Sequence, residues 1–432
     1  MADTIFALST PRGRSGVAVI RVSGSEALAA AAAMGGRLPE PRRAALRLIR
    51  DPASGEVLDQ GVVLIFPEGE SYTGEASVEF QLHGSLAVQD SVLSVLSAMP
   101  GLRVAEPGEF TRRALDNNRL DLTQIEGLAD LIDAETGAQQ RQALQVMRGV
   151  IGDLSAGWRQ SLVRSLSLLE ATIDFSDEEL PEHLSEEAAA LTRQVIAEMQ
   201  AQLSGAEISE RVRDGFEVAL VGAPNVGKST LLNRLVGRDA AITSEVAGTT
   251  RDVIEVRMNL AGLPVTFLDT AGVRETDDHI EIIGVSRTRA RAAAADLRVF
   301  LTDDGAPGDL ADLVQDGDIV LRAKADLGGD FGDEGISGKT GQGLDSLLER
   351  VKAIFQSKAT GATLLIRERH REAIAEAVAA LERAVGHLGS PELVDLAAED
   401  YRLAVARLDA LVGKVDVEDL LDEIFASFCL GK

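Results

Sequence analysis

The stretch Gly222-Ala-Pro-Asn-Val-Gly-Lys-Ser229 decides the expected fold of this 432-residue chain. It fits the pattern G-x-x-x-x-G-K-[ST] and lies between an apolar run at 217–221 and a helical pattern at 229–236, the context that this pattern requires. Its glycines would let backbone N–H groups surround a phosphate, its lysine would reach the outer phosphate oxygens, and Ser229 would offer a hydroxyl to Mg²⁺. The dipole of the following helix favours the same anion. An ordinary turn between a strand and a helix is the alternative.

Strand and helix patterns alternate on both sides of this stretch, across residues 216–355. Further short apolar runs at 265–268, 297–301 and 319–322 read as strands. Alternation of this kind predicts a mainly parallel, doubly wound sheet. Residues 120–213 and 367–432 are instead helical in pattern, because apolar residues recur there every three or four positions. Pro181 marks a break between two long helices. The sequence therefore predicts an α/β domain inserted into a helical one.

The first 120 residues mix both kinds of pattern. Runs at 5–8, 17–22, 61–66 and 77–82 read as strands, and runs at 25–34 and 86–97 read as helices. The tetrapeptide Pro107-Gly-Glu-Phe110 precedes a further helical stretch with Arg112 and Arg113.

Composition restricts the class of protein. Apolar residues are 45% and charged residues 26%, as in ordinary globular proteins, and aromatic residues are only 3%. No apolar run approaches the roughly 20 residues that span a bilayer. The first residues lack the pattern of a secretory signal. One cysteine, Cys429, excludes an intrachain disulfide framework and a cysteine-rich zinc site. We expect a cytoplasmic protein that does not interact with membranes.

The net charge of −26 is unevenly distributed. Residues 1–120 carry −2 and the remaining 312 residues carry −24. Non-specific nucleic-acid binding depends on basic surface, so the composition argues against it. The N-terminal quarter is the least repulsive place for a polyanion. Solubility alone is the plainer explanation of the acidic remainder.

Two further motifs follow the phosphate stretch in the order that a nucleotide switch needs. Gly248-Thr-Thr-Arg-Asp252 lies about twenty residues beyond Ser229. A threonine there can supply a second Mg²⁺ ligand, with Thr250 the first choice and Thr249 the second. Asp269-Thr-Ala-Gly272 ends a predicted strand. Its carboxylate can hold Mg²⁺ through water, and its glycine N–H can reach a γ-phosphate.

The base-recognition motif is less regular. Ala323-Lys-Ala-Asp326 follows a predicted strand where Asn-Lys-x-Asp is the usual pattern. Asp326 can still accept hydrogen bonds from guanine N1–H and N2–H₂, and adenine would leave its carboxylate unpaired. Lys324 can lie along the base, and Ser337-Gly338-Lys339 supplies a backbone loop near guanine O6. We therefore expect guanine selectivity with weakened affinity. A structural role for the motif, or an ATPase, is the alternative.

No glutamine follows Gly272, so the group that orients the attacking water must come from elsewhere. The candidates are Arg274, Glu275 and Glu281. Each could equally be a solvated surface charge.

At this point the whole chain resembles the tRNA modification GTPases of the MnmE (TrmE) family. The resemblance rests on the three motifs at 222–229, 248–252 and 269–272 and on Asn225 within the first. It rests also on 16–24, 107–110 and the ending Phe428-Cys-Leu-Gly-Lys432. The Cys-x-Gly-Lys ending is highly specific.

The resemblance implies a fold of class α/β plus all-α. It implies an N-terminal α+β folate-binding and dimerisation domain (1–119), a helical domain in two parts (120–213 and 358–432) and an inserted Ras-like P-loop GTPase domain with a doubly wound sheet (214–357). It implies a homodimer, and a heterotetramer with an FAD-binding partner of the MnmG (GidA) type. The pair adds an aminomethyl or carboxymethylaminomethyl group to C5 of wobble uridine 34 in certain tRNAs.

The resemblance also implies cofactors and site residues. The cofactors are GTP, Mg²⁺, K⁺ and 5,10-methylene-tetrahydrofolate, or its 5-formyl analogue, as the one-carbon carrier. K⁺ would take the place of an arginine finger, and oxygens of Asn225, Ser244, Val246 and Thr249 would hold it. Mg²⁺ would be held by Ser229 and Thr250. Positive charge there suits the transition state of phosphoryl transfer. Arg21, Glu79, Arg119 and Lys432 would bind folate, with arginine where a lysine is frequent at 119.

The residues expected to carry catalysis are Lys228, Arg274, Glu281 and Cys429. Of these, Glu281 would orient the attacking water. The residues expected to contact the nucleotide and its ions are Asn225, Val226, Gly227, Lys228, Ser229, Thr230, Ser244, Glu245, Val246, Ala247, Gly248, Thr249, Thr250, Asp269, Thr270, Ala271, Gly272, Lys324, Asp326, Ser337, Gly338 and Lys339. A GTP-gated assembly or ribosome-associated switch, with no part in the modification chemistry, is the alternative function.

Overall fold

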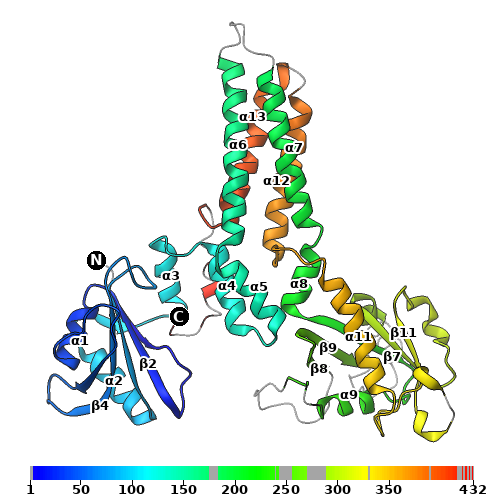
Figure 1. The fold of residues 1–432 in the computed structure, drawn as a ribbon, viewed down its shortest axis with the longest axis horizontal. Coiled ribbons are helices and arrows are strands. Elements are labelled where there is room, and N and C mark those ends of the chain that lie inside the picture. Colours follow the sequence, from blue (N-terminus) through cyan, green and yellow to red (C-terminus); the bar gives the residue numbers. More distant parts are fainter. Residues whose placement is uncertain are drawn as a thin grey trace, which may run out of the picture. The chain divides into compact units, whose positions relative to one another are not determined.

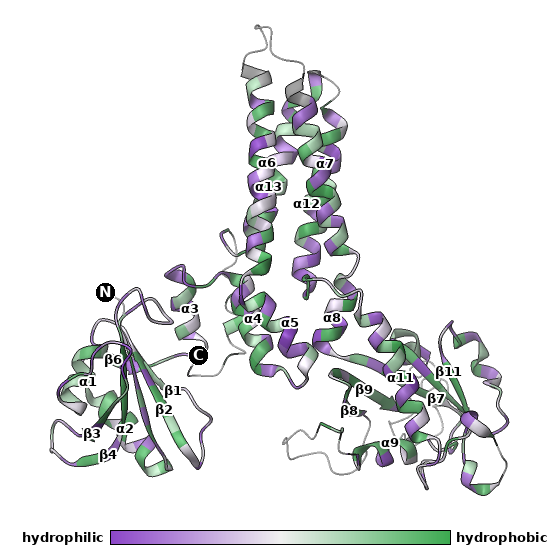
Figure 2. Ribbon diagram, in the orientation of Figure 1, coloured by the Kyte–Doolittle hydropathy of each residue, from purple (hydrophilic) through white to green (hydrophobic). Residues whose placement is uncertain are grey.

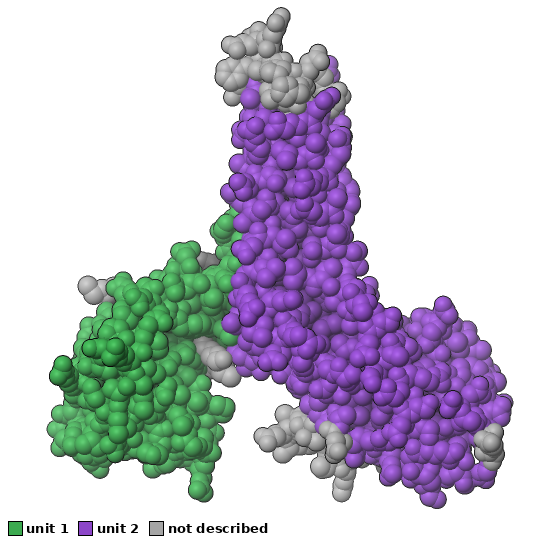
Figure 3. Space-filling view, viewed as in Figure 1, with its two compact units in different colours: residues 1–129, 409–432 green, residues 130–408 purple. Residues whose placement is uncertain are grey.

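A computed structural model describes residues 3–174, 183–238, 240–242, 255–269, 289–328, 331–388 and 391–415, together with residues 421, 424, 425, 428 and 431. The chain divides into two compact units, one of residues 1–129 and 409–432 and one of residues 130–408 (Figure 3). The four domain ranges expected from the sequence stay predictions. Pro181 lies outside the described residues.

The first unit is built on a six-stranded sheet with the order β3-β4-β5-β2-β1-β6. Its pairs are antiparallel except β1 with β6. Helices α1 and α2 pack against one face, where their alanines, methionine and aliphatic residues complete a core with Phe6, Ile20 and Phe80. Phe110 of α3 packs on Ile5 and Ala7 of β1. The elements are β1 (Thr4–Leu8), β2 (Ser15–Ser23), α1 (Ala27–Gly35), β3 (Ala45–Arg50), β4 (Val57–Phe66), β5 (Ser77–Gly84), α2 (Leu86–Ala98), β6 (Leu102–Val104), α3 (Glu109–Asp116) and α4 (Leu122–Asp133).

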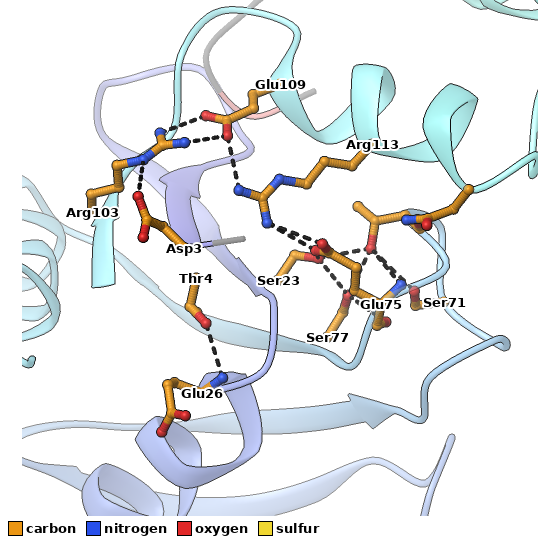
Figure 4. A network of polar contacts seen from close by, with 12 residues as sticks. Asp3, Thr4, Ser23, Glu26, Ser71, Glu75, Ser77, Arg103, Glu109 and Arg113 are labelled. Atoms are coloured by element: carbon orange, nitrogen blue, oxygen red, sulfur yellow. Dashed lines mark hydrogen bonds and ion pairs between the residues drawn. The ribbon is translucent and has the colours of Figure 1, made fainter. Parts of the chain in front are cut away.

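A chain of ion pairs ties α3 to the sheet and to the loop before β5 (Figure 4). Glu109 accepts from Arg103 Nη2 at 2.6 Å and from Arg113 Nη2 at 2.9 Å. Arg113 also donates to Glu75 Oε2 at 3.0 Å, and Ser23 Oγ donates to the same oxygen at 2.8 Å. Because each buried charge has opposite charges beside it, the network holds the N-terminus of α3 in a fixed place.

Glu109 makes this network sensitive to acid. Burial alone would raise the pKa of its carboxyl, but hydrogen bonds from Arg103, from the Glu106 N–H and from Arg113 outweigh burial and lower the pKa to about 2. The usual value is near 4.5. A pKa that is lower in the folded state stabilises the fold above pH 4.5, and this stability is lost as the pH falls toward 2.

We therefore expect Glu109→Gln to lower the stability of the first unit by about 1–2 kcal/mol near pH 7, after allowing for solvent screening. The difference between variant and wild type should shrink by more than half between pH 5 and pH 3, as measured by calorimetric unfolding of the full chain. Glu106→Gln is the control, since that side chain is exposed. A difference independent of pH would show that the ion pairs do not stabilise the ionised carboxyl.

The second unit contains a helical bundle and a second sheet. Helices α6, α7 and α12 lie side by side with α13 (Figure 1). Tyr401 of α13 is fully buried, and its hydroxyl lies 2.5 Å from Thr192 Oγ1 of α7. The helices are α5 (Gly137–Met147), α6 (Val150–Asp174), α7 (His183–Leu203), α8 (Ala206–Asp214), α9 (Lys228–Val236), α11 (Leu344–Ala359), α12 (Glu368–His387) and α13 (Val394–Leu411), with short 3₁₀ turns at Gly308–Leu313, Ala325–Leu327, Gly332–Glu334 and Pro391–Leu393.

The second sheet has the order β11-β10-β7-β9-β8. Its first four strands are parallel and β8 is antiparallel to β9. Both faces of its centre are covered, so its central strands are mostly apolar, as β9 shows in Figure 2. The strands are β7 (Phe216–Gly222), β8 (Glu255–Leu260), β9 (Leu263–Asp269), β10 (Leu297–Thr302) and β11 (Ile319–Arg322). The predicted fold class, a doubly wound α/β sheet together with α+β and all-α parts, is confirmed.

Candidate functional site

The loop between β7 and α9 has a backbone that its sequence explains. The chain takes left-handed conformations at Asn225 (φ 61°) and Gly227 (φ 119°), which asparagine and glycine adopt most easily. A Cβ at Gly222 would lie 2.4 Å from the Leu301 carbonyl oxygen of β10. The loop therefore curls tightly over the ends of two adjacent strands, as the G-x-x-x-x-G-K-[ST] pattern predicts.

Lys228 lies across this loop. Its Nζ donates to the carbonyl oxygens of Gly222 at 2.8 Å and Ala223 at 3.0 Å. The residue is only 5% exposed, and burial lowers the pKa of its ammonium, an effect that the charge of Asp269 opposes. A buried cation that donates to neutral carbonyls is poised to move to a bound anion, because charge-assisted hydrogen bonds are stronger.

Ser229 and Asp269 meet beside the lysine. Ser229 Oγ donates to Asp269 Oδ2 at 2.7 Å, and Asp269 is 2% exposed at the end of β9. A hydroxyl and a carboxylate next to a phosphate loop are ligands of the kind that Mg²⁺ prefers. The two residues thus fit the ion that the sequence predicts for them.

The motif expected to recognise the base, residues 323–326, lies near the loop Ser337-Gly338-Lys339. Ser337 Oγ donates to Asp326 Oδ1 at 2.6 Å, and this hydrogen bond lowers the pKa of the Asp326 carboxyl. Asp326 therefore stays ionised and can accept from N–H donors. Lys324 has a φ of 57°, and its ammonium lies 3.0 Å from Asp303 Oδ1.

A single cavity of about 290 Å³ joins the phosphate loop to the base motif. It brings together residues that lie about a hundred positions apart in the sequence, on the carboxyl ends of β7 and β11, where ligands of open α/β sheets bind. Apolar side chains of Val226, Leu231, Leu301, Ala323, Leu327 and Ile336 form part of its lining. The expected site residues that line it are Asn225, Val226, Gly227, Thr230, Lys324, Asp326, Ser337, Gly338 and Lys339.

Other expected residues lie outside the described part of the chain, so the structure does not place them. They are Ser244, Glu245, Val246, Ala247, Gly248, Thr249, Thr250, Thr270, Ala271, Gly272, Arg274, Glu275, Glu281, Cys429 and Lys432. Their roles, and those of the placed residues, stay predictions.

The first unit holds the other expected group. Arg21 of β2 and Glu79 of β5 are cross-strand partners, and Arg21 Nη2 lies 3.0 Å from Glu79 Oε1. The Arg21 guanidinium also lies 5.4 Å from the ring centre of Tyr72 and 5.7 Å from that of Phe110. Such distances favour cation–π contact. Tyr72 lies in no recognisable sequence motif; its one distinguishing signal is that the chain has only two tyrosines.

Arg119 approaches the loop that carries Tyr72. A Cβ at Gly74 would lie 3.3 Å from Arg119 Cγ, so Gly74 allows the arginine stem to pack closely. Arg119 follows α3, and its N–H donates to the Ala114 carbonyl at 2.7 Å. The structure thus puts Arg21 and Glu79 together and places Arg119 against the neighbouring loop.

Comparisons with known proteins cover the full chain. The family profile described as the MnmE helical domain matches residues 122–429, and that described as the GTP-binding protein TrmE N-terminus matches residues 4–119. The tRNA modification GTPase MnmE of a Cereibacter sphaeroides strain is 55% identical over 432 residues. That of Parvibaculum lavamentivorans is 49% identical over 437 residues. Both alignments cover 100% of this chain and 100% of the relative.

Two solved structures match part of the chain. Aquifex aeolicus Era bound to GDP and AlF4⁻ is 31% identical, over 32% of this chain and 56% of that chain, with a TM-score of 0.24. The G domain of the T. maritima FeoB iron transporter is 21% identical, over 33% of this chain and 98% of that chain, with a TM-score of 0.25. Within the described residues, no helix has the length and apolar character to cross a membrane.

Proposed function

The chain belongs to the MnmE family of tRNA modification GTPases, and from this premise we propose that K⁺ stimulates its GTP hydrolysis and that an FAD-dependent partner works with it on tRNA. The product would be an aminomethyl or carboxymethylaminomethyl group at C5 of the wobble uridine, with carbon from methylene-tetrahydrofolate. The observation that carries the proposal is the cavity that joins the phosphate loop to Asp326.

The described residues suggest how GTP would be held. Lys228 would leave the carbonyls of Gly222 and Ala223 for phosphate oxygens, while the N–H groups of the loop surround the phosphates. Ser229 and Asp269 would separate to hold Mg²⁺, which would neutralise charge on the phosphates during transfer. Asp326 would accept from the guanine base.

The potassium part of the proposal rests on Asn225. This side chain is exposed at the tip of the phosphate loop and lines the cavity, so its amide oxygen can face both phosphate and solvent. K⁺ bound there would add positive charge where negative charge develops in the transition state. Glu281 would orient the attacking water.

The folate part rests on Arg21 and Glu79. Their side chains are about one-fifth exposed, at 20% and 19%, so an arriving ligand could reach both. A carboxylate that accepts from pterin N–H groups, with a guanidinium beside it that can donate to the pterin carbonyl oxygen, fits the pterin ring of a reduced folate. The rings of Tyr72 and Phe110 beside Arg21 offer flat apolar surface for a fused ring system. Arg119 and Lys432 would complete this site.

The proposed assembly is a cytoplasmic homodimer that joins an FAD-binding MnmG-type partner in a heterotetramer. The negative charge of this chain bears on which of the two proteins binds the tRNA. A net charge of −26 disfavours contact with tRNA phosphates, so we propose that the partner supplies most of the tRNA surface.

Reconstitution tests the proposed function. With the flavoprotein partner, tRNA, GTP and methylene-tetrahydrofolate, we expect modified wobble uridine by mass spectrometry of digested tRNA. Arg21→Ala should remove the modification, because the guanidinium that would hold the folate is lost, and should leave GTP turnover within about twofold of wild type. Arg43→Ala is the control, since Arg43 is 77% exposed.

Glu79→Gln gives a second test should Arg21→Ala destabilise the sheet, because glutamine keeps the size of the side chain. Both variants should weaken the binding of 5-formyl-tetrahydrofolate to the full chain, as measured by calorimetry. Unchanged folate binding and unchanged modification in a folded Arg21→Ala variant would contradict the folate site.

A further inference from the structure

The base end of the nucleotide cavity departs from the usual pattern at Ala323, and the structure shows what surrounds this residue. Ala323 follows β11 directly and is 8% exposed. It belongs to the same apolar core as Val226 and Leu301, and all three line the cavity. The position where the pattern has an amide side chain therefore has only a methyl group, facing a ligand-sized space.

The orientation of a bound purine follows from the two ends of this cavity. The phosphates belong at the loop that ends in Lys228, and Asp326 lies at the base end. A purine is attached to its sugar through the five-membered ring, so that ring points back toward the phosphate loop. The six-membered ring, with its N1–H and N2–H₂ donors, then points toward Asp326. Ala323 and Val226 of the phosphate loop belong to one apolar core and both line the cavity, so we place the methyl group beside the five-membered ring.

N7 is the hydrogen-bond acceptor of that ring, and on guanine it is a standard recognition point together with O6. The backbone N–H groups of Ala323 and Ala325 already donate within the protein. The Ala323 N–H donates to the Thr302 carbonyl at 2.8 Å, and the Ala325 N–H donates to the Ile336 carbonyl at 3.2 Å. Lys324 is engaged by Asp303. Leu301, Val226 and Ile336 have apolar side chains.

The edge of the base that carries N1–H and N2–H₂ faces a strong hydrogen-bond acceptor, Asp326. Asp326 keeps one carboxylate oxygen beyond the one that accepts from Ser337, and Gly338 and Lys339 also line the cavity there. An ionised carboxylate forms strong hydrogen bonds with N–H donors. Recognition is therefore concentrated on one edge of the base.

We propose that this chain recognises guanine through the Asp326 edge alone and leaves N7 unread because of Ala323, so that a guanine nucleotide without N7 binds as tightly as the natural one. Ala323 is thus a specificity-determining residue. It lowers the affinity for the nucleotide without lowering the discrimination against bases that lack the N2 amine. The inference deepens the proposed GTP site and rests on it.

Competition binding to the full chain tests this proposal. GDP, 7-deaza-GDP and inosine diphosphate, each with Mg²⁺, compete with a fluorescent GDP analogue. For the wild-type protein we expect GDP and 7-deaza-GDP to bind within about twofold of each other. Inosine diphosphate lacks the N2 amine and should bind at least about tenfold more weakly, since a hydrogen bond to a charged group is lost.

Ala323→Asn supplies the missing donor. It should tighten GDP binding by about three- to tenfold, the effect of one net hydrogen bond, and leave 7-deaza-GDP binding unchanged. The variant replaces a buried methyl group and could fail to fold, so the wild-type comparison of GDP with 7-deaza-GDP stands as a test without it.

The outcomes distinguish a failure of the claim about N7 from a failure of the Asp326 base site. A wild-type preference of fivefold or more for GDP over 7-deaza-GDP would overturn the proposal, because another group would then read N7. An Ala323→Asn protein that binds both nucleotides equally would also overturn it. If inosine diphosphate binds the wild type as tightly as GDP, the Asp326 site itself is wrong, whatever the result with 7-deaza-GDP.

Discussion

Replacing Lys228 by alanine should weaken GTP binding by about 100-fold or more and remove measurable GTP turnover. The ammonium is the one described cation that lies on the phosphate loop, and its contact with phosphate would be charge-assisted on several oxygens. Equilibrium binding of a fluorescent GTP analogue and release of phosphate are the measurements.

The same change should not destabilise the fold. Burial lowers the pKa of Lys228 more than the charge of Asp269 raises it, so the buried charge is held at a cost in free energy. The unfolding temperature of Lys228→Ala should therefore equal or exceed that of wild type. Lys352→Ala is the control, because this lysine pairs with Glu349 within α11. Tight GTP binding by folded Lys228→Ala would refute the phosphate site.

Asp326→Asn should exchange guanine for xanthine as the preferred base. An asparagine cannot accept both N1–H and N2–H₂, and GTP binding should fall by about 100-fold. Xanthine carries an oxygen in place of the N2 amine, so the asparagine amide can donate to it and accept from N1–H. Competition of GTP against XTP measures the exchange.

Asp333→Asn, on an exposed 3₁₀ turn at Gly332–Glu334, is the control and should keep the preference for GTP. If Asp326→Asn still prefers GTP to XTP, the carboxylate does not face the Watson–Crick edge of the base. The expected result is independent of Ala323, since we propose that this residue lies at the other ring of the purine.

The sequence predicted the central strands and the phosphate loop because their signals are local. β7, β9 and β10 are mostly apolar, and the loop is fixed by its glycines and by the helix that follows it. Three strands were missed, namely β3, β6 and β8. All three lie at sheet edges. An edge strand packs against one neighbour only, so it carries exposed residues such as Leu46 and Leu48 and a weaker pattern.

The candidate site residues also differ in whether the sequence alone could identify them. Residues inside short motifs, such as Lys228, Ser229 and Asp326, could be named because motif spacing fixes their roles. The contacts of Arg21 with Tyr72 and Phe110 could not be found in this way, since they join residues about 50 and 90 positions apart through the fold. The pairing of Lys324 with Asp303 also depends on how β10 and β11 align.

The measurement that tests the central proposal most directly is steady-state GTP hydrolysis in KCl and in NaCl at equal ionic strength, with ATP as control substrate. We expect GTP turnover at least about tenfold faster in KCl, because a bound cation stabilises transition-state charge, and little ATP turnover. Asn225→Gly should remove the difference between the salts, because glycine keeps the left-handed backbone and lacks the amide. Asn233→Ala, an exposed change on α9, should keep it. Equal GTP turnover in both salts by the wild-type protein would contradict a potassium-stimulated GTPase.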